Sequence, residues 1–131
     1  MGRLSAEELW ERLHQKLGED LRGVIRFDGT DREMVLRDDV REAYSAIEDR
    51  KVVDDAIISQ LSAGDTQSTF KVGDLLGNVK IFEEAWVLQY PDSVPGKSGY
   101  IVSIQRTGGT ASIADIEACL QVLSEAIQST D

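Results

Sequence analysis

The sequence predicts an α+β fold, a five-stranded antiparallel sheet with helices packed on it, in the order α-β-β-α-β-β-β-α. Residues 77–106 fit three consecutive antiparallel strands, and in the middle one Trp86, Leu88 and Tyr90 fall on one face with the period of two that strands require. Apolar side chains at helical spacing both precede and follow this stretch. A length of 131 residues suits one domain, which we assign to residues 1–131.

The first helix is predicted to begin at Ser5. Ser5 and Glu8 have the spacing of a capping box, in which the two side chains satisfy amides at a helix start. Gly18 is typical of a helix end. The apolar face of this helix comprises Leu9, Trp10, Leu13 and Leu17.

A β-hairpin is predicted next, from residues 21–27 and 34–37. Residues 28–31, Asp-Gly-Thr-Asp, are turn chemistry because Gly and Asp tolerate positive φ. Asp38 and Asp39 are alternative N-caps for the helix that follows.

The middle of the chain leaves two questions open. An apolar helical face over residues 40–47 meets the charged run 48–51, and the face resumes with a shifted phase at residues 53–61. This pattern fits one kinked helix or two helices that meet near Asp49. Residues 66–76 are expected to form an edge strand, with a loop over the sheet as the alternative.

Three strands and a closing helix complete the predicted order. The strands are residues 77–83, 85–90 and 99–106, joined by a tight corner at Glu83-Glu84 and a longer loop. The helix covers residues 112–128, and its apolar stripe consists of Ile113, Ile116, Leu120, Leu123 and Ile127.

The charge balance is strongly acidic. The 24 Asp and Glu residues against 14 Lys and Arg give a formal charge of -10, so nucleic acid is an unfavourable partner. Few of the basic residues are Lys, and this composition is typical of proteins in a salt-rich cytoplasm, where the Debye length falls to about 3 Å at 1 M salt. An ordinary acidic protein is the alternative.

The expected environment is the cytoplasm. Cys119 is the only cysteine, so no disulfide forms within the chain. The N-terminus leads into a charged helix without a signal-like apolar run, and no stretch approaches the roughly 20 apolar residues of a membrane span. We expect Cys119 to act as a small core residue.

No catalytic residue, metal ligand or cofactor is predicted. His14 is the only histidine, which argues against multi-histidine metal sites and Ser-His-Asp chemistry. Adjacent carboxylates point in different directions and read as solvated surface; the pairs are Asp38-Asp39, Asp54-Asp55 and Glu83-Glu84. An enzyme without a recognisable motif is a remote alternative.

Two further features have a bland and a functional interpretation. Gly108 and Gly109 precede a helix, where amides can hold an anion, but no Lys follows them, and a connector is the favoured interpretation. Trp86, Tyr90 and Tyr100 share one face of adjacent strands. They fill a core, or they line the pocket of a small-ligand sensor of PAS- or GAF-like shape.

The order of elements over almost the full chain resembles the roadblock/LC7 family, whose fold is longin- and profilin-like. The most family-like segments are residues 77–90 and 99–104. The chain is also similar to small haloarchaeal proteins, which fits its acidic and Lys-poor surface.

The roadblock resemblance implies a homodimer in which the long middle helix and the third strand of each subunit meet. The matching positions are Tyr44, Ile47, Val53 and Ile57 on the helix, and Val79, Ile81 and Glu83 on the strand. The charged run 48–51 departs from the family pattern. The resemblance further implies a non-catalytic interaction or scaffold module, and small GTPases or their regulators as partners.

Overall fold

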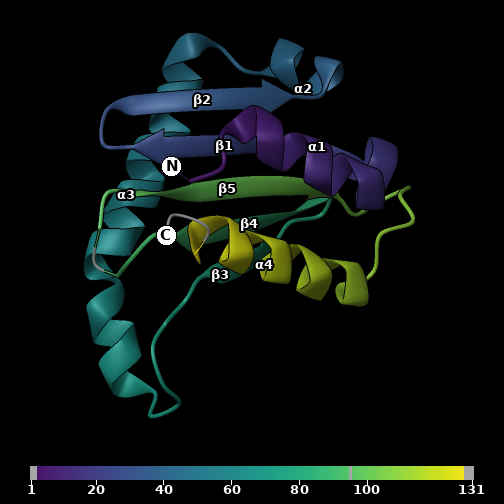
Figure 1. Ribbon diagram of the computed structural model, residues 1–131. Helices are drawn as coiled ribbons and strands as arrows, with labels where there is room; N and C mark the ends of the chain where they lie inside the picture. Colours follow the sequence, from purple (N-terminus) through teal and green to yellow (C-terminus); the bar gives the residue numbers. More distant parts are fainter. Residues whose placement is uncertain (1–2, 95, 129–131) are drawn as a thin grey trace.

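A five-stranded antiparallel sheet forms the centre of an α+β fold, as predicted (Figure 1). The computed structural model describes residues 3–94 and 96–128, and its strands are ordered β2-β1-β5-β4-β3. In chain order the elements are α1 Ala6–Leu17, the 3-10 turn Gly18–Asp20, β1 Leu21–Asp28, β2 Asp31–Leu36, α2 Asp38–Ala43, α3 Ala46–Thr69, β3 Asn78–Ile81, β4 Ala85–Pro91, β5 Ser98–Gln105 and α4 Ile113–Gln128.

The predicted start of the chain is confirmed in detail. The Ser5 hydroxyl accepts a hydrogen bond from the Glu8 amide at 3.1 Å, and the Glu8 carboxylate accepts one from the Ser5 amide at 2.9 Å. The next strand pair is longer than predicted, because Asp28 pairs with Asp31 across a turn of two residues. Gly29 supplies the positive φ of 62° that this turn needs.

The middle of the chain forms two helices, but they meet at residues 44–45 rather than near Asp49. Ser45 and Glu48 make a second capping box. The Ser45 amide nitrogen lies 2.9 Å from the Glu48 carboxylate, and the Glu48 amide nitrogen lies 3.2 Å from the Ser45 hydroxyl. Ser45 therefore begins a new helix. α3 then continues through the charged run 48–51 without a break.

The predicted strand over residues 66–76 is absent. Residues 66–69 belong to α3, and residues 70–77 connect α3 to β3 without regular structure. Phe70 and Val72 alternate with polar residues, but among the described residues neither pairs with a strand of the sheet. We refer to residues 70–77 as the connection.

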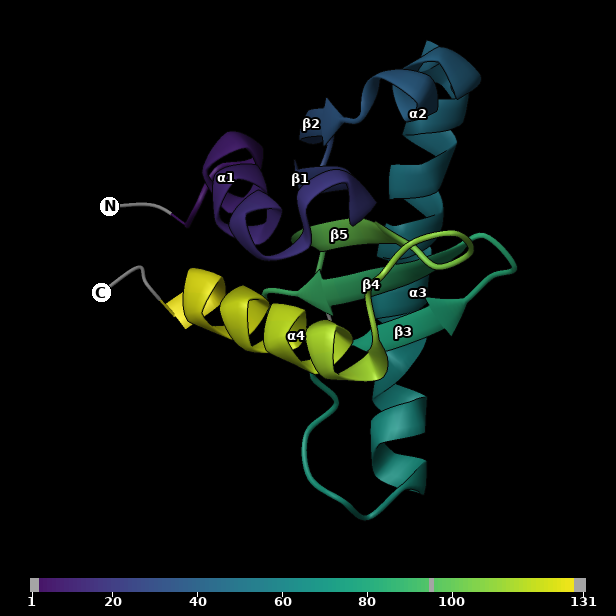
Figure 2. The same cartoon turned by 90° about the vertical axis from the view of Figure 1, so that its right-hand side faces the viewer.

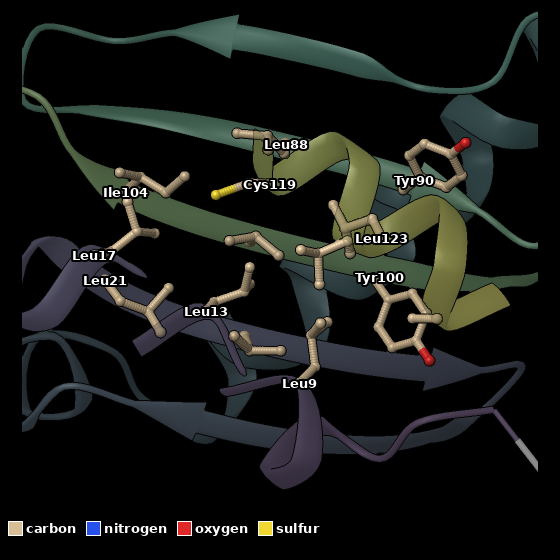
Figure 3. Close-up of a cluster of buried hydrophobic side chains, with 14 of the residues drawn as sticks. Leu9, Leu13, Leu17, Leu21, Leu88, Tyr90, Tyr100, Ile104, Cys119 and Leu123 are labelled. Carbon is tan, nitrogen blue, oxygen red and sulfur yellow. The ribbon is translucent and has the colours of Figure 1, made fainter. Parts of the chain in front are cut away.

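One face of the sheet is covered by α1 and α4, which lie side by side on it (Figure 2). The side chains of both helices interlock with inward-facing residues of β1, β4 and β5 (Figure 3). The fully buried members of this cluster include Leu9, Leu13, Leu21, Leu88, Tyr100, Val102, Ile104, Cys119 and Leu123. This is the main core of the protein.

The opposite face carries α2 and α3 (Figure 2). α3 runs across the strands near the end of β1 and extends past the edge strand β3 (Figures 1 and 2). A small cluster lies beneath it, formed by Ile25, Phe27, Val53, Ala56 and Ile101. Two buried glutamines add polar contacts: Gln89 donates to the Ala56 carbonyl at 2.8 Å, and Gln60 donates to the Gly96 carbonyl at 3.0 Å.

Candidate protein–protein interface

β3 is one of the two edge strands of the sheet, with β2 at the opposite side, and we refer to the outer side of β3 as the free edge. Phe82 donates its amide to the Ala85 carbonyl at 2.8 Å, in register with the β3–β4 ladder. Because hydrogen-bonded and non-hydrogen-bonded pairs alternate in an antiparallel ladder, the amides and carbonyls of Val79 and Ile81 point away from β4. Ile81 is 67% exposed. β3 is therefore a short strand that presents pairing groups and apolar side chains to its surroundings.

Apolar side chains also line the outer side of α3. Ile47, Ile58 and Leu61 are exposed, and their spacing places them on one side of the helix. Ile58 is 64% exposed. Charged residues of both signs lie among them, since Arg50 and Asp54 are 3.9 Å apart and Lys51 and Asp55 are 3.3 Å apart.

The structure separates the predicted interface residues into two groups. Four of them are exposed: Tyr44 between α2 and α3, Ile47 on α3, and Val79 and Ile81 on β3. Val53 is only 4% exposed and Ile57 packs against the small cluster, so both hold α3 to its own sheet. The prediction that Val53 lies in an interface is wrong, because the helix turns that side inward.

Several interface candidates were not predicted from the sequence. Ile58 and Leu61 on α3, and Phe82 after β3, are exposed large apolar residues. The Ile57-Ile58 pair was a readable signal, because a helix that buries one of two adjacent isoleucines must expose the other.

A hollow of about 590 Å³ lies on the α3 side of the sheet, beside the half that α3 covers. Its apolar lining includes Ile25, Met34, Leu36, Val52 and Val87. Lys80 and Phe82 reach it from the free edge. Half of this sheet face is therefore open toward the edge strand β3.

The amides after Gly108 and Gly109 hold a carboxylate of the chain itself. Asp20 accepts hydrogen bonds from the amides of Thr110 and Ala111, at 2.9 and 3.1 Å. A Cβ on Gly109 would stand 2.7 Å from the Asp20 carboxylate. The glycines thus leave room for Asp20, which precedes β1, to bind the residues before α4. The amides that could have held an external anion already donate to this carboxylate.

The aromatic face predicted for a core or a sensor pocket lies in the core. Trp86, Tyr90 and Tyr100 are buried beneath α1 and α4. The Tyr100 hydroxyl donates to the Leu4 carbonyl at 2.6 Å, and burial raises the pKa of Tyr100 to about 12. These rings are packing residues.

A half-buried ion cluster lies at the end of the same face. Arg26 donates two hydrogen bonds to Asp92, at 2.6 and 2.8 Å, and Arg3 lies 3.2 Å from the same carboxylate. Burial raises the pKa of Asp92, but the hydrogen bonds and charge of Arg26 outweigh it and hold that pKa below its usual value. The cluster ties the residues before α1 to the sheet.

The remaining candidates for chemistry have structural surroundings. Cys119 is fully buried, and burial raises the pKa of its thiol to about 11. The His14 ring stacks on Trp10, with 5.8 Å between ring centroids. Asp39 pairs with Arg37 at 2.6 Å. Within residues 3–94 and 96–128, no three His, Cys, Asp or Glu residues gather as a metal site.

Among the described helices, none combines the length and apolar character needed to cross a bilayer. A family model with the description "Domain of unknown function (DUF7522)" matches residues 7–124, from α1 into α4. No curated protein matches the sequence.

Proposed function

The chain belongs to the DUF7522 family, and we propose that it is a non-catalytic protein–protein interaction module that acts as a homodimer in the cytoplasm. The dimer joins α3 and β3 of the two subunits. The observation that carries this proposal is the distribution of exposed apolar side chains. In the described part of the chain, all the large ones except Ile113 lie between Tyr44 and Phe82.

The shape of the α3 side supports a two-fold arrangement. α3 overhangs the β3 edge at one end of the strands (Figure 1). The residues that line the hollow, among them Leu36, Phe82 and Ser103, place it toward the other end. A half-turn about an axis normal to the sheet at β3 exchanges these ends. The overhanging turns of each α3 then lie over the open half-face of the other copy. Such a self-complementary contact closes at two subunits.

The edge strand sets the register of this arrangement. A pairing centred on Lys80 places two lysines opposite each other, which is unfavourable. A pairing centred on Val79 matches Lys80 with Asn78 of the second copy, and Ile81 with Gly77, the last residue of the connection. We therefore propose that Val79 lies at the two-fold axis.

Sedimentation equilibrium tests the proposal with a matched pair of variants. The wild-type chain is expected at twice its mass of 14.5 kDa. Phe82→Asp places a charge at the β3 edge and in the hollow that the second copy covers, and is expected to weaken association by about a hundredfold or more. Ile113→Asp adds the same charge at a site of similar exposure, 69%, on α4, and is expected to remain dimeric.

A monomeric wild-type chain across a wide range of salt and protein concentration contradicts the homodimer. Retention of the 590 Å³ hollow in such a monomer favours the small-ligand sensor instead.

Small GTPases or their regulators are the partner class that the roadblock resemblance implies. The test is co-sedimentation of the dimer with small GTPases from the same organism, in GDP and GTP states. A complex that Phe82→Asp abolishes supports a partner site built from the dimer. If the dimer forms a complex with none of these GTPases, this partner class is rejected and the proposed homodimer is unaffected.

A further inference from the structure

A second groove, separate from the half-open face, lies on the α4 side of the sheet. It has a volume of about 570 Å³ and runs between the connection and α4. Tyr90 and Val79 belong to its sheet side, and Leu120 and Gln121 to its α4 side. Val79 thus belongs both to the free edge and to this groove.

The connection lines this groove with apolar side chains that no core requires. Val72 is 87% exposed and Leu76 is 61% exposed, and Phe70 stands beside them. Exposed apolar residues that line one groove together mark an interaction site more strongly than single exposed residues do. The groove is therefore a candidate binding site for an apolar polypeptide segment.

The charges around the groove select the kind of segment. Among its described lining residues the charged ones are Asp74 and Glu117, both acidic. α4 has three carboxylates, at Asp115, Glu117 and Glu125, and no Lys or Arg over residues 113–128. Lys71 lies on the connection but outside the lining. A basic partner segment gains from this field, and a second copy of a chain with charge -10 does not.

The walls of this groove consist mostly of side chains rather than of the unpaired backbone groups of an edge strand. The outward amides and carbonyls of β3 are engaged in the proposed dimer. A helix satisfies its own backbone and needs only side-chain contacts, so it suits a groove of this kind. We propose that this groove binds an amphipathic helix of a partner protein, with an apolar face and basic flanking residues. This inference rests on the proposed interaction module and names the chemistry of its partner.

The test uses a synthetic helical peptide with Leu on one face and Lys on the other, labelled with a fluorophore. Anisotropy is measured with the full-length chain at physiological salt. The amphipathic peptide is expected to bind at least about tenfold more tightly than a scrambled peptide of the same composition. Equal binding of the two means attraction to net charge alone, and overturns the proposal.

Two variants locate the site. Leu76→Asp is expected to weaken peptide binding by about tenfold or more, whereas Ile113→Asp, with the same change of charge, is expected to leave it unchanged. Glu117→Lys is expected to shift the preference from a Leu/Lys peptide toward a Leu/Glu peptide. Equal effects of Leu76→Asp and Ile113→Asp overturn the assignment to this groove.

Amide chemical shifts and sedimentation on the same samples separate this proposal from the homodimer. Peptide-induced shifts are expected in residues 72–79 and 117–124. Shifts confined to other surfaces contradict the groove. Leu76→Asp is expected to keep the oligomeric state of the wild type. If it changes that state and leaves peptide binding intact, the groove holds a second copy, and the proposed helix is wrong. Loss of the dimer in Phe82→Asp with retained peptide binding separates the two surfaces.

Discussion

The same strands form both faces of the sheet, yet helices cover the two faces to different extents. On the face beneath α1 and α4, large side chains from both helices and three strands close over one another (Figure 3). On the α3 face, five buried residues hold one crossing helix, and half of the face stays open. The first face stabilises the fold, and the second presents apolar surface that a stable monomer does not need.

The largest effect expected from this comparison comes from truncating one buried side chain in each of the two cores. Leu123→Ala on the α1/α4 face is expected to lower the free energy of unfolding by about 3 kcal/mol, since Leu123 is fully buried. Val53→Ala on the α3 face removes fewer atoms beside an open hollow and is expected to cost about 1 kcal/mol. Urea unfolding of both variants measures the difference. Equal losses would show that the α3 face is packed as firmly as the other.

The next largest effect is expected in how the melting temperature depends on protein concentration. If association covers the α3 face, the melting temperature of the wild type rises with concentration by mass action. The melting temperature of Phe82→Asp is expected to stay constant over the same range. Calorimetry over a hundredfold range of concentration measures this. A wild-type melting temperature independent of concentration argues against coverage of the α3 face by a second copy.

Acid should weaken the well-packed face through Asp92. Its pKa is lower in the folded chain than its unfolded value of about 3.9, so its contribution to stability is present above that value and is lost as the pH falls through the folded pKa. The stability difference between wild type and Asp92→Asn is therefore expected to shrink below about pH 4.

Asp39→Asn is the control for this effect. Asp39 also pairs with an arginine, and the hydrogen bond from Arg37 lowers its pKa to about 2. Because this pair is exposed and screened by solvent, we expect a much smaller loss of stability. Thermal unfolding from pH 7 to pH 3 compares the two variants. An equal loss in both would contradict the assignment of Asp92 as an anchor.

Salt should give the smallest change. With a charge of -10 per chain, self-repulsion opposes both folding and association, and screening reduces it. We expect the melting temperature to rise by a few degrees between low and molar KCl, and dimerisation to strengthen. Circular dichroism at several KCl concentrations tests this. An unchanged melting temperature rejects the salt-adapted interpretation.

Local signals were enough to predict most elements of the fold. The Ser5 capping box, the alternation from Trp86 to Tyr90 and the apolar stripe of the last helix each predicted the observed element. Their information lies within a few residues, where backbone hydrogen bonding and burial period are decided. The Ser45–Glu48 box was equally readable and places the start of α3.

Features that depend on distant residues were not predictable in the same way. Asp20 holds the amides before α4 across a separation of 90 residues. The connection carries strand-like alternation, but a strand needs a neighbour, and none is present at that position among the described residues. The open half-face follows from the angle at which α3 crosses the sheet, which no periodicity encodes.

Cross-linking of single cysteines along β3 tests the central claim, a two-fold seam at that strand, most directly. Only a residue at the two-fold axis meets its own copy, and directly paired Cα atoms about 4.5 to 5.5 Å apart allow a disulfide. Cys119 is buried and stays in place as background. Under mild oxidation we expect Val79→Cys to form a covalent dimer rapidly, and Arg32→Cys on the opposite edge strand β2 to remain monomeric. Equal cross-linking at the two edges, or none at Val79→Cys, Lys80→Cys and Ile81→Cys, would contradict the seam.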